Sequence, residues 1–578
     1  MSNQGSAELD FSALPSYRPR TFVPPAADLV NVDVVTALYQ RLLDRAVATA
    51  ADLEQWLADR SELDSAVDQE RSALYIRMTC QTDDAARTAA YKRFIETVEP
   101  AIAMLSDKLD RQYLAARETI ALDERRYGVY DRLVRTDVNL FREENVPLKT
   151  QESLLSQDYQ AIIGAMMVEF DGRERTLPEM DKLLLEPDRA LRERAWRATT
   201  RRRLAERERL DDLFDRMQAV RGRIAANAAC RDFCRYQFKA MHRFDYTPED
   251  CQAYHEATAR CVVPLWRQIA QDRRRRMGLE TLRPWDMSVD PEGRPPLKPF
   301  DHVSDLTART EDVFHRIDPT LGEQFTMLSR QGLLDLASRK GKAPGGYQAV
   351  LSEARRPFIF MNAVGVDGDV RTLLHEGGHA FHSLAAVDEP LAVYRHAPLE
   401  FCEVASMGME LLADEYLGAF YNAGDMKRSR RKHFEDVVFI LPWVATVDSF
   451  QHWIYAHPGH TCQERQAAWI EIFDRYGAGI DWTGLEEEKA SLWHRQLHIF
   501  EYPFYYIEYG IAQLGALQLW VRARKDPRKA LADYRKALAL GGSRPLPELF
   551  AAAGLRFDFS AATVEPLVEA VAEELKRL

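Results

Sequence analysis

Long apolar runs, an excess of positive charge and paired cysteines are all missing from this sequence of 578 residues. No run of about 18 apolar residues occurs, so we expect no membrane-spanning helix. The formal net charge of −12 and the isoelectric point near 5.7 argue against a nucleic-acid partner. The seven cysteines are scattered and odd in number, which is typical of reduced thiols in a cytoplasmic protein.

The N-terminal third also lacks an apolar signal-peptide core and has almost no glycine. Residues 1–30 carry several prolines and predict an extended arm rather than a signal peptide. From residue 32 to residue 210, apolar residues recur at spacings of three and four, which predicts amphipathic helices almost throughout. We therefore expect an arm over residues 1–30 and an N-terminal helical domain over residues 31–205.

The remainder of the chain has a helical pattern apart from two stretches. Residues 277–299 are dense in Pro, Gly and Asp and predict an ordered loop, and helical patterning returns over residues 304–338. The apolar run FIFMN (Phe358–Asn362), bounded by Pro357 and a Gly/Asp turn, is the one strand signature. The sequence thus predicts a mainly α-helical fold with a small β-sheet beside the helix that follows.

That helix contains the string HEGGHAFH, which begins at His375. On a helix His375 and His379 project about 40° apart, one turn apart in height, so both imidazoles can reach one metal ion. Glu376 lies on an adjacent face, where it can contact a metal-activated water molecule as a general base. A match this short also arises by chance, and a polar helix face is then the simpler explanation.

The surroundings of the motif favour a metal site. Gly377 and Gly378 lie inside the helix at a cost of about 1 kcal/mol each relative to Ala, and close approach of another backbone or of a ligand would explain them. Zinc needs a third protein ligand and an open position. The candidates are Glu400, Glu403 and Glu410 on the next helical segment, and spacing alone does not choose among them.

These segments resemble the thimet-type oligopeptidases, in particular their bacterial oligoendopeptidase F branch. The family pattern is HExGHxxH, followed 24 residues beyond the second histidine by a glutamate in a segment like F-x-E-x-P-S. This chain has HEGGHAFH and then FCEVAS, so the resemblance assigns Glu403 as the third ligand beside His375 and His379. Ala405 stands where many members have Pro.

Further segments extend the resemblance over residues 238–516. KGKAPGGYQ (Lys340–Gln348) and PFIFMN resemble the family's glycine loop and substrate strand, so we expect a peptide to pair along the edge of Phe358–Asn362 by main-chain hydrogen bonds. HRFDYTPEDCQAYHEA (His242–Ala257) also fits the branch. The N-terminal third matches only in its helical character. The resemblance implies a large zincin-like helical ellipsoid, with a deep substrate channel between two halves and a catalytic domain over residues 206–578.

The segment His498–Ala516 looks like the family's His/Tyr segment. Tyrosines at this density in a helical protein more often serve packing, but a phenol O–H is also a good donor to a developing oxyanion. The resemblance places His498, Tyr502, Tyr505 and Tyr509 in this catalytic role, with Tyr509 first and Tyr506 in reserve.

The resemblance as a whole implies a cytoplasmic zinc metalloendopeptidase. It implies one Zn²⁺ per chain, oligopeptide substrates, and no nucleic-acid or membrane partner, and it leaves the oligomeric state undetermined. Glu376 is the expected general base. Glu410 or Glu400 would orient a ligand imidazole, and His382 is expected to pack or to face the substrate rather than bind the metal.

Two alternatives remain open. A related helical zincin could be a carboxypeptidase or dipeptidyl carboxypeptidase, which needs a fixed cation for the terminal carboxylate, and Arg371 or Lys342 could supply one. A non-catalytic helical metal-binding protein is the second, although such a protein does not require Glu376. The histidine-rich string QHWIYAHPGH (Gln451–His460) is not expected to form a second metal site, because Pro458 and Gly459 break any helix there.

Overall fold

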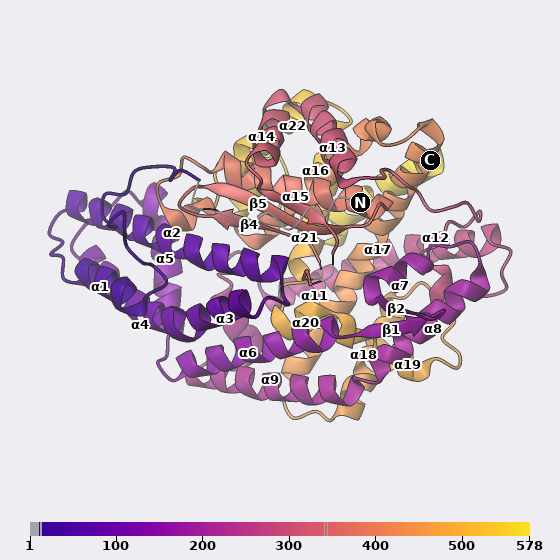
Figure 1. The fold of residues 1–578 in the computed structure, drawn as a ribbon, viewed down its shortest axis with the longest axis horizontal. Helices are drawn as coiled ribbons and strands as arrows, with labels where there is room; N and C mark the ends of the chain where they lie inside the picture. The colour runs from indigo at the N-terminus through magenta and orange to yellow at the C-terminus, as the bar shows by residue number, and fades with distance from the viewer. Residues whose placement is uncertain (1–10, 12–13, 340, 344) are drawn as a thin grey trace. The chain divides into compact units, whose positions relative to one another are not determined.

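The fold is described by a computed structural model over residues 11, 14–339, 341–343 and 345–578. Helices dominate and the β-sheets are small, which confirms the predicted fold class (Figure 1). The chain forms two compact units, each built from separate segments. Unit 1 comprises the chain up to Thr150, Phe300–Ala419 and Asp526–Leu555, and unit 2 comprises Gln151–Pro299, Phe420–Lys525 and Arg556–Leu578. The domain boundaries at residues 30 and 205, and the channel, stay predictions.

The long helices come in two sets. Those of unit 1 are α1 (Val32–Leu43), α2 (Ala50–Cys80), α3 (Ala85–Arg93), α4 (Glu99–Arg117), α5 (Glu124–Leu140), α13 (Val303–Ile317), α14 (Pro319–Arg330), α15 (Asp367–Ala385), α16 (Leu399–Ala413), α22 (Pro527–Leu538) and α23 (Leu546–Ala552). Those of unit 2 are α7 (Leu177–Leu183), α8 (Arg189–Leu204), α9 (Arg207–Asn227), α10 (Phe233–Ala240), α11 (Pro248–Ala257), α12 (Val263–Arg276), α17 (Ala423–Ala456), α18 (Cys462–Tyr476), α19 (Glu486–Ala490), α20 (Leu497–Glu501), α21 (Ile507–Ala523) and α24 (Ala561–Arg577). Helix α6 (Asn145–Gly164) crosses the boundary between them.

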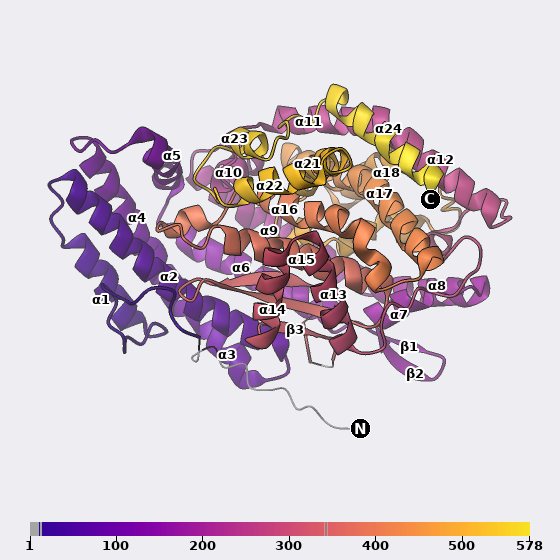
Figure 2. The ribbon, with the colours of Figure 1, turned by 90° about the horizontal axis from the view of Figure 1, so that it is seen from above.

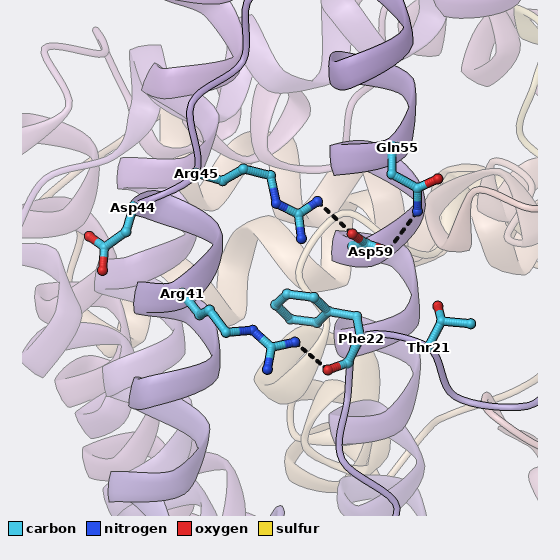
Figure 3. A pocket seen from close by; sticks show the side chains of 7 residues that line it. All are labelled: Thr21, Phe22, Arg41, Asp44, Arg45, Gln55 and Asp59. Atoms are coloured by element: carbon cyan, nitrogen blue, oxygen red, sulfur yellow. Dashed lines mark hydrogen bonds and ion pairs between the residues drawn. The ribbon is translucent and has the colours of Figure 1, made fainter.

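The first two helices of unit 1 show how the sequence specifies these elements. Thr49 begins α2 with a capping box to Asp52, and the buried face of the helix contributes Trp56, which stacks against Tyr113 of α4. The irregular arm before α1 packs on the same core through Phe22. The arm, α1 and α2 border a hollow of about 560 Å³ (Figure 3).

The polar groups of that hollow are already satisfied by the protein. Arg45 pairs with Asp59 at 2.5 Å, and Arg41 donates to the Phe22 carbonyl while lying 3.8 Å from the Phe22 ring centroid (Figure 3). We therefore assign this hollow a structural role.

The three-stranded sheet of unit 1 lies beside α15 and corrects one expectation. Its order is β3 (Leu334–Ala337), β5 (Arg356–Ala363), β4 (Tyr347–Leu351), with β3 parallel and β4 antiparallel to β5. The run Phe358–Asn362 forms a strand as predicted, but it is the central strand, so the interpretation that a peptide pairs on its edge is wrong. A nearly continuous apolar run is what a strand with neighbours on both sides needs. The edge strands are β3 and β4.

Short strands form in two places where the sequence predicts helices. Residues 334–337 were expected to be helical and form β3, and the helical stretch up to residue 210 contains the hairpin of β1 (Met167–Phe170) and β2 (Arg173–Thr176) beside α7 and α8 (Figure 2). Asp171 and Gly172 turn the hairpin with φ of 51° and 71°. An Asp-Gly pair is a hairpin signal that could have revealed this element.

Helix α17 is the one helix in the described ranges that is long and apolar enough to cross a membrane. Its most apolar window has a mean hydropathy of 1.2, and 72% of that window is buried inside the protein. Burial of this extent is what the central helix of a packed unit shows.

Candidate active site

The connection from β5 to α15 is fixed by one carboxylate. Asp369 Oδ2 accepts hydrogen bonds from the backbone N–H groups of residues 364, 365 and 366, at 2.7–2.9 Å. The N–H of Val366 belongs to the N-cap residue, which a helix leaves without an intrahelical partner, and the other two belong to the turn before the helix. The first turn of α15 is thereby tied to the end of the central strand, which sets the direction in which the HEGGH residues project.

The two glycines of the motif are explained by close packing. A Cβ atom at Gly378 would lie 2.6 Å from the Ala405 carbonyl oxygen and from the Ser406 Cα atom of α16, and one at Gly377 would lie 2.5 Å from the Phe314 ring. Only glycine permits this approach, so the expected close contact is with a neighbouring backbone. The contact brings α16, and with it Glu403, against the histidines.

Three side chains predicted to bind the metal converge. His375 Nε2 and His379 Nε2 lie 3.4 and 3.6 Å from Glu403 Oε2, and the two imidazole ring centroids are 4.9 Å apart. Two imidazole nitrogens and one carboxylate oxygen are the donors that catalytic zinc uses with three protein ligands. Their ligand atoms form one of two such candidate groups in the described residues; the other is Cys251, Asp448 and His452 in unit 2.

The neighbours of the triad hold it in a metal-binding form. Glu410 Oε1 lies 2.7 Å from His375 Nδ1 and accepts its proton, which leaves Nε2 as the lone-pair donor. Ser406 Oγ donates to Glu403 Oε2 at 3.0 Å. Burial lowers the pKa of His375, but the carboxylates of Glu403 and Glu410 outweigh it and raise that pKa well above its ordinary value. The pocket therefore favours a positive charge at this point, which suits a metal cation.

Glu376 lies buried beside the triad and outside it. Its Oε2 atom has no hydrogen-bond partner among the described residues, and burial raises the pKa of the carboxyl to about 7. A Cβ atom at Gly346 would lie 3.6 Å from Glu376 Oε1, so the backbone of the glycine loop passes beside this carboxylate. Lys340 and Pro344 of that loop lie outside the described residues. A buried carboxylate without a partner is suited to accept a proton from a ligand.

Three residues that sequence analysis left undecided differ in their surroundings. Glu410 hydrogen-bonds a candidate ligand, as described above, and Glu400 is buried on α16. His382 is buried against the Phe401 ring, with centroids 5.9 Å apart, and burial lowers its pKa to about 3. A neutral imidazole in this setting packs the core rather than contacting a metal.

Both cations considered for an exopeptidase have partners in unit 1. Arg371 pairs with Asp414 at 3.0 Å in the interior. Lys342 Nζ donates to Asp335 Oδ1 at 2.9 Å and to three carbonyl oxygens at 2.6–3.0 Å. The Lys342 ammonium is thus held by acceptors of the fold, and Arg371 is buried against Asp414, so neither is placed to anchor a substrate carboxylate.

The His/Tyr segment lies in unit 2, where its members form a cluster of their own. Ring centroids of Tyr502, Tyr505 and Tyr509 lie 5.6–6.3 Å from that of His498, and the Tyr509 hydroxyl is 3.4 Å from His498 Nε2. Tyr502 is 52% exposed, whereas Tyr506 is buried, which raises its pKa to about 12. Tyr506 therefore packs in the core, with its ring centroid 5.0 Å from that of His498.

The turn between His498 and Tyr509 contains strained backbone that sequence reasoning missed. Phe504 has a φ of 65°, which is costly for a bulky residue. Gln451 accepts from its N–H at 2.7 Å, and Arg243 donates to its carbonyl at 2.5 Å and to Glu508 at 2.6 Å. Arg243 falls in a segment noted only for family resemblance, and no motif distinguishes a buried arginine of this kind.

Hydrogen bonds also define the protonation state of His498. The Trp443 indole N–H can only donate, and it donates to Gln496 Oε1 at 3.2 Å. The amide NH₂ of Gln496 consequently faces His498 Nδ1, at 2.9 Å, and donates to it. An imidazole that accepts at Nδ1 is neutral and carries its proton on Nε2, the nitrogen near Tyr509.

We expect ¹⁵N NMR of histidine-labelled protein to report the Nε2–H tautomer for His498, assigned by its loss in His498→Gln. In Gln496→Glu the new carboxylate accepts a proton from Nδ1, so the His498 pKa should rise by about one unit or more. A wild-type spectrum with the proton on Nδ1 would contradict the inferred hydrogen-bond chain. Exposed Gln331→Glu serves as the matched control and should leave His498 unchanged.

Two neighbouring helices bring together three candidate metal ligands, two imidazoles and one carboxylate, beside a second buried carboxylate that could act as a base. A mainly helical chain with this site has the features of a metal-dependent hydrolase. Comparison with known proteins gives the family. The model for Peptidase family M3 matches residues 182–569, and that for the Peptidase M3 N-terminal domain matches residues 26–141. The chain belongs to peptidase family M3, a metallopeptidase family.

Individual relatives agree with this assignment. The chain is 26% identical over 245 residues to an oligoendopeptidase F homolog of Borreliella burgdorferi, and 27% identical over 240 residues to oligopeptidase PepF of Bacillus subtilis. These matches span 40% and 39% of this chain, and 40% and 34% of the relatives, so well under two thirds of either relative is covered.

Solved structures match over nearly the whole chain. A crystal structure assigned to oligoendopeptidase F has a TM-score of 0.90 at 29% identity, covering 98% of this chain and 99% of that one. A complex of Pz peptidase A with an inhibitor has a TM-score of 0.90 at 27% identity, with the same coverage.

Proposed function

We propose that the protein is a zinc-dependent oligoendopeptidase that hydrolyses internal bonds of short, unstructured peptides in the cytoplasm. The observation that carries the proposal is the convergence of His375, His379 and Glu403 beside a buried, unpartnered Glu376. When bound by these three ligands, zinc would supply a Lewis acid that polarises the scissile carbonyl and lowers the pKa of water to about 7.

Glu376 then performs the proton transfers. Its carboxylate accepts a proton from the attacking water molecule and afterwards returns it to the leaving amine. Glu410 keeps the His375 imidazole oriented through Nδ1, at 2.7 Å, throughout the cycle. The arrangement separates ligand and base roles between neighbouring faces of α15.

His498 and the tyrosines are proposed to stabilise the oxyanion and to bind substrate carbonyls, as the family resemblance implies. A neutral His498 with its proton on Nε2 is a hydrogen-bond donor, and so is each phenol. Donors of this kind act on charge that develops during the reaction.

Tyr509→Phe is expected to lower kcat by about two to three orders of magnitude, the scale for one lost oxyanion donor, with KM little changed. Steady-state kinetics with a quenched peptide measures both constants. Tyr506→Phe, at a buried position in the same segment, is the matched control and should retain most of its kcat. A change in KM alone for Tyr509→Phe would show that this residue only positions the substrate.

Cleavage of peptides blocked at both ends tests the proposed reaction. An endopeptidase cuts acetylated and amidated peptides of about 5–20 residues, a range that the family resemblance implies, whereas an exopeptidase requires a free terminus. We expect cleavage of the blocked series and of denatured protein fragments, and none of a stable folded protein, because an extended backbone is needed to pair with an edge strand such as β4. Cleavage only of peptides with a free C-terminus would favour the carboxypeptidase alternative.

A further inference from the structure

A hollow of about 300 Å³ lies within unit 2, close to the His/Tyr cluster and separate from the candidate metal ligands. Its aromatic wall is formed by Trp196 of α8 and by Phe439 and Trp443 of α17. Phe439 is 37% exposed, which is unusual for a large apolar side chain of a long core helix. The wall offers apolar surface to a small group that enters from solvent.

Two arginines line the same hollow. In the part of the chain that the structure describes, neither Arg203 of α8 nor Arg495 of the 3₁₀ turn Leu492–Arg495 forms an ion pair or a side-chain hydrogen bond. The Arg495 guanidinium carbon lies 5.5 Å from the Trp443 ring centroid, a cation–π contact that leaves its N–H donors unused.

Positive charge is not fully compensated where Arg203 and Arg495 line the hollow. Burial lowers the pKa of both guanidinium groups, and the charge of Arg203 lowers that of Arg495 further. Asp181 is the carboxylate that acts on both, while Glu488, another acid of the wall, acts on neither. Arg203 is partly buried and Arg495 is exposed to solvent, and the two guanidinium groups share one anion at the hollow.

The buried arginines of unit 2, in contrast, all have partners within the fold. Arg192 donates to Asp286 and to three carbonyl oxygens, Arg221 to Glu152, and Arg465 to Asp211 and Asp215. Arg203 and Arg495 differ from these buried arginines because no acceptor of the described chain holds their N–H groups, so an anion that enters the hollow from solvent can accept hydrogen bonds from both.

The hollow is one side chain away from His498. Gln496 and Trp443 both line it, and Gln496 donates to His498 Nδ1 at 2.9 Å. A molecule that contacts His498 can therefore extend a neighbouring group into the hollow without leaving unit 2.

We propose that this hollow binds a carboxylate of the substrate peptide, with Arg203 and Arg495 as donors and the Trp196–Phe439–Trp443 wall packing its methylene groups. The carboxylate belongs either to an acidic side chain or to the peptide C-terminus. A guanidinium fork matches a planar carboxylate with two parallel hydrogen bonds. The proposal rests on the proposed function, in which His498 contacts the peptide.

Peptide binding to the zinc-loaded, full-length Glu376→Gln protein tests the hollow without turnover. Isothermal titration compares matched pairs: the same peptide with a free or amidated C-terminus, and with Glu or Gln scanned through its sequence. In at least one of these pairs, we expect the peptide that carries the carboxylate to bind about tenfold or more tightly than its neutral counterpart, which is the scale of charge-assisted hydrogen bonds. The pair that shows the preference identifies the source of the carboxylate.

Substitution of the arginines locates the effect. Arg495→Gln and Arg203→Gln, each in the Glu376→Gln background, should remove the preference, and Arg201→Gln, at an exposed position of the same helix, should keep it. If the Glu376→Gln protein, with both arginines intact, bound the acidic and the neutral peptide of every pair equally, the proposal would be overturned. A preference that survives in folded Arg495→Gln and Arg203→Gln would overturn it as well.

The experiments distinguish a wrong assignment of the carboxylate site from a wrong assignment of the peptidase function. If the wild-type enzyme cleaves acid and neutral peptides with equal KM, the carboxylate site is refuted and the peptidase assignment stands. If acid peptides bind preferentially but no peptide is cleaved in a zinc-dependent manner, the peptidase mechanism is refuted and the carboxylate site stands.

Discussion

Glu376→Gln is expected to lose peptide hydrolysis almost completely while keeping its metal and its fold. General-base catalysis contributes about 10²–10⁴-fold, and kcat should fall by at least that factor. The residue is buried with Oε2 unpartnered among the described residues, so glutamine removes the cost of burying a carboxylate that is ionised. The melting temperature should therefore be unchanged or higher.

Kinetics with a blocked peptide, metal analysis and thermal unfolding of the same sample check these three expectations. Glu415→Gln, at an exposed position of unit 1, is the matched control and should behave as wild type. A metal-loaded Glu376→Gln enzyme with substantial activity would remove Glu376 from the role of base.

Glu403→Ala is expected to reduce metal affinity more than any other single glutamate substitution on α16. It removes a ligand atom that lies within 3.6 Å of both imidazoles. Glu410→Ala removes only the partner of His375 Nδ1, and loss of such a neighbour costs about 10–100-fold in metal affinity or activity. Glu400→Ala should have the smallest effect on the metal.

Competition with a chromophoric chelator gives the metal dissociation constants of the three variants under one set of conditions. Circular dichroism of each variant separates loss of metal from loss of fold. If Glu400→Ala or Glu410→Ala released the metal as readily as Glu403→Ala, the third ligand would be wrongly assigned.

The helical part of the fold could be predicted because its information is local. Apolar residues at spacings of three and four specify the helices, and the glycines of HEGGH indicated a close approach, which is that of the α16 backbone at Gly378 and of the Phe314 ring at Gly377. The strand pairing could not be predicted in the same way. The strands β2 (RERT) and β3 (LDLA) are four residues long, and what makes them strands is a partner elsewhere in the chain.

The candidate site shows the same division between local and distant information. His375, Glu376 and His379 follow from spacing on one helix, whereas spacing left Glu400, Glu403 and Glu410 equivalent and only the family resemblance chose Glu403. The partners that fix the His/Tyr segment, Arg243 and Gln496, could not be found, because each acts through a contact with a strained carbonyl or a ring nitrogen that no motif encodes.

Zinc titration of the metal-free protein, with a blocked peptide as substrate, tests the central claim most directly. Activity should be absent after chelation while the helical circular dichroism signal remains, and it should rise linearly with added zinc to a plateau at one equivalent per chain. In parallel, Glu403→Ala should give little activity at that stoichiometry. Full activity of the metal-free protein, or a plateau that needs a second equivalent, would contradict a single zinc held by His375, His379 and Glu403.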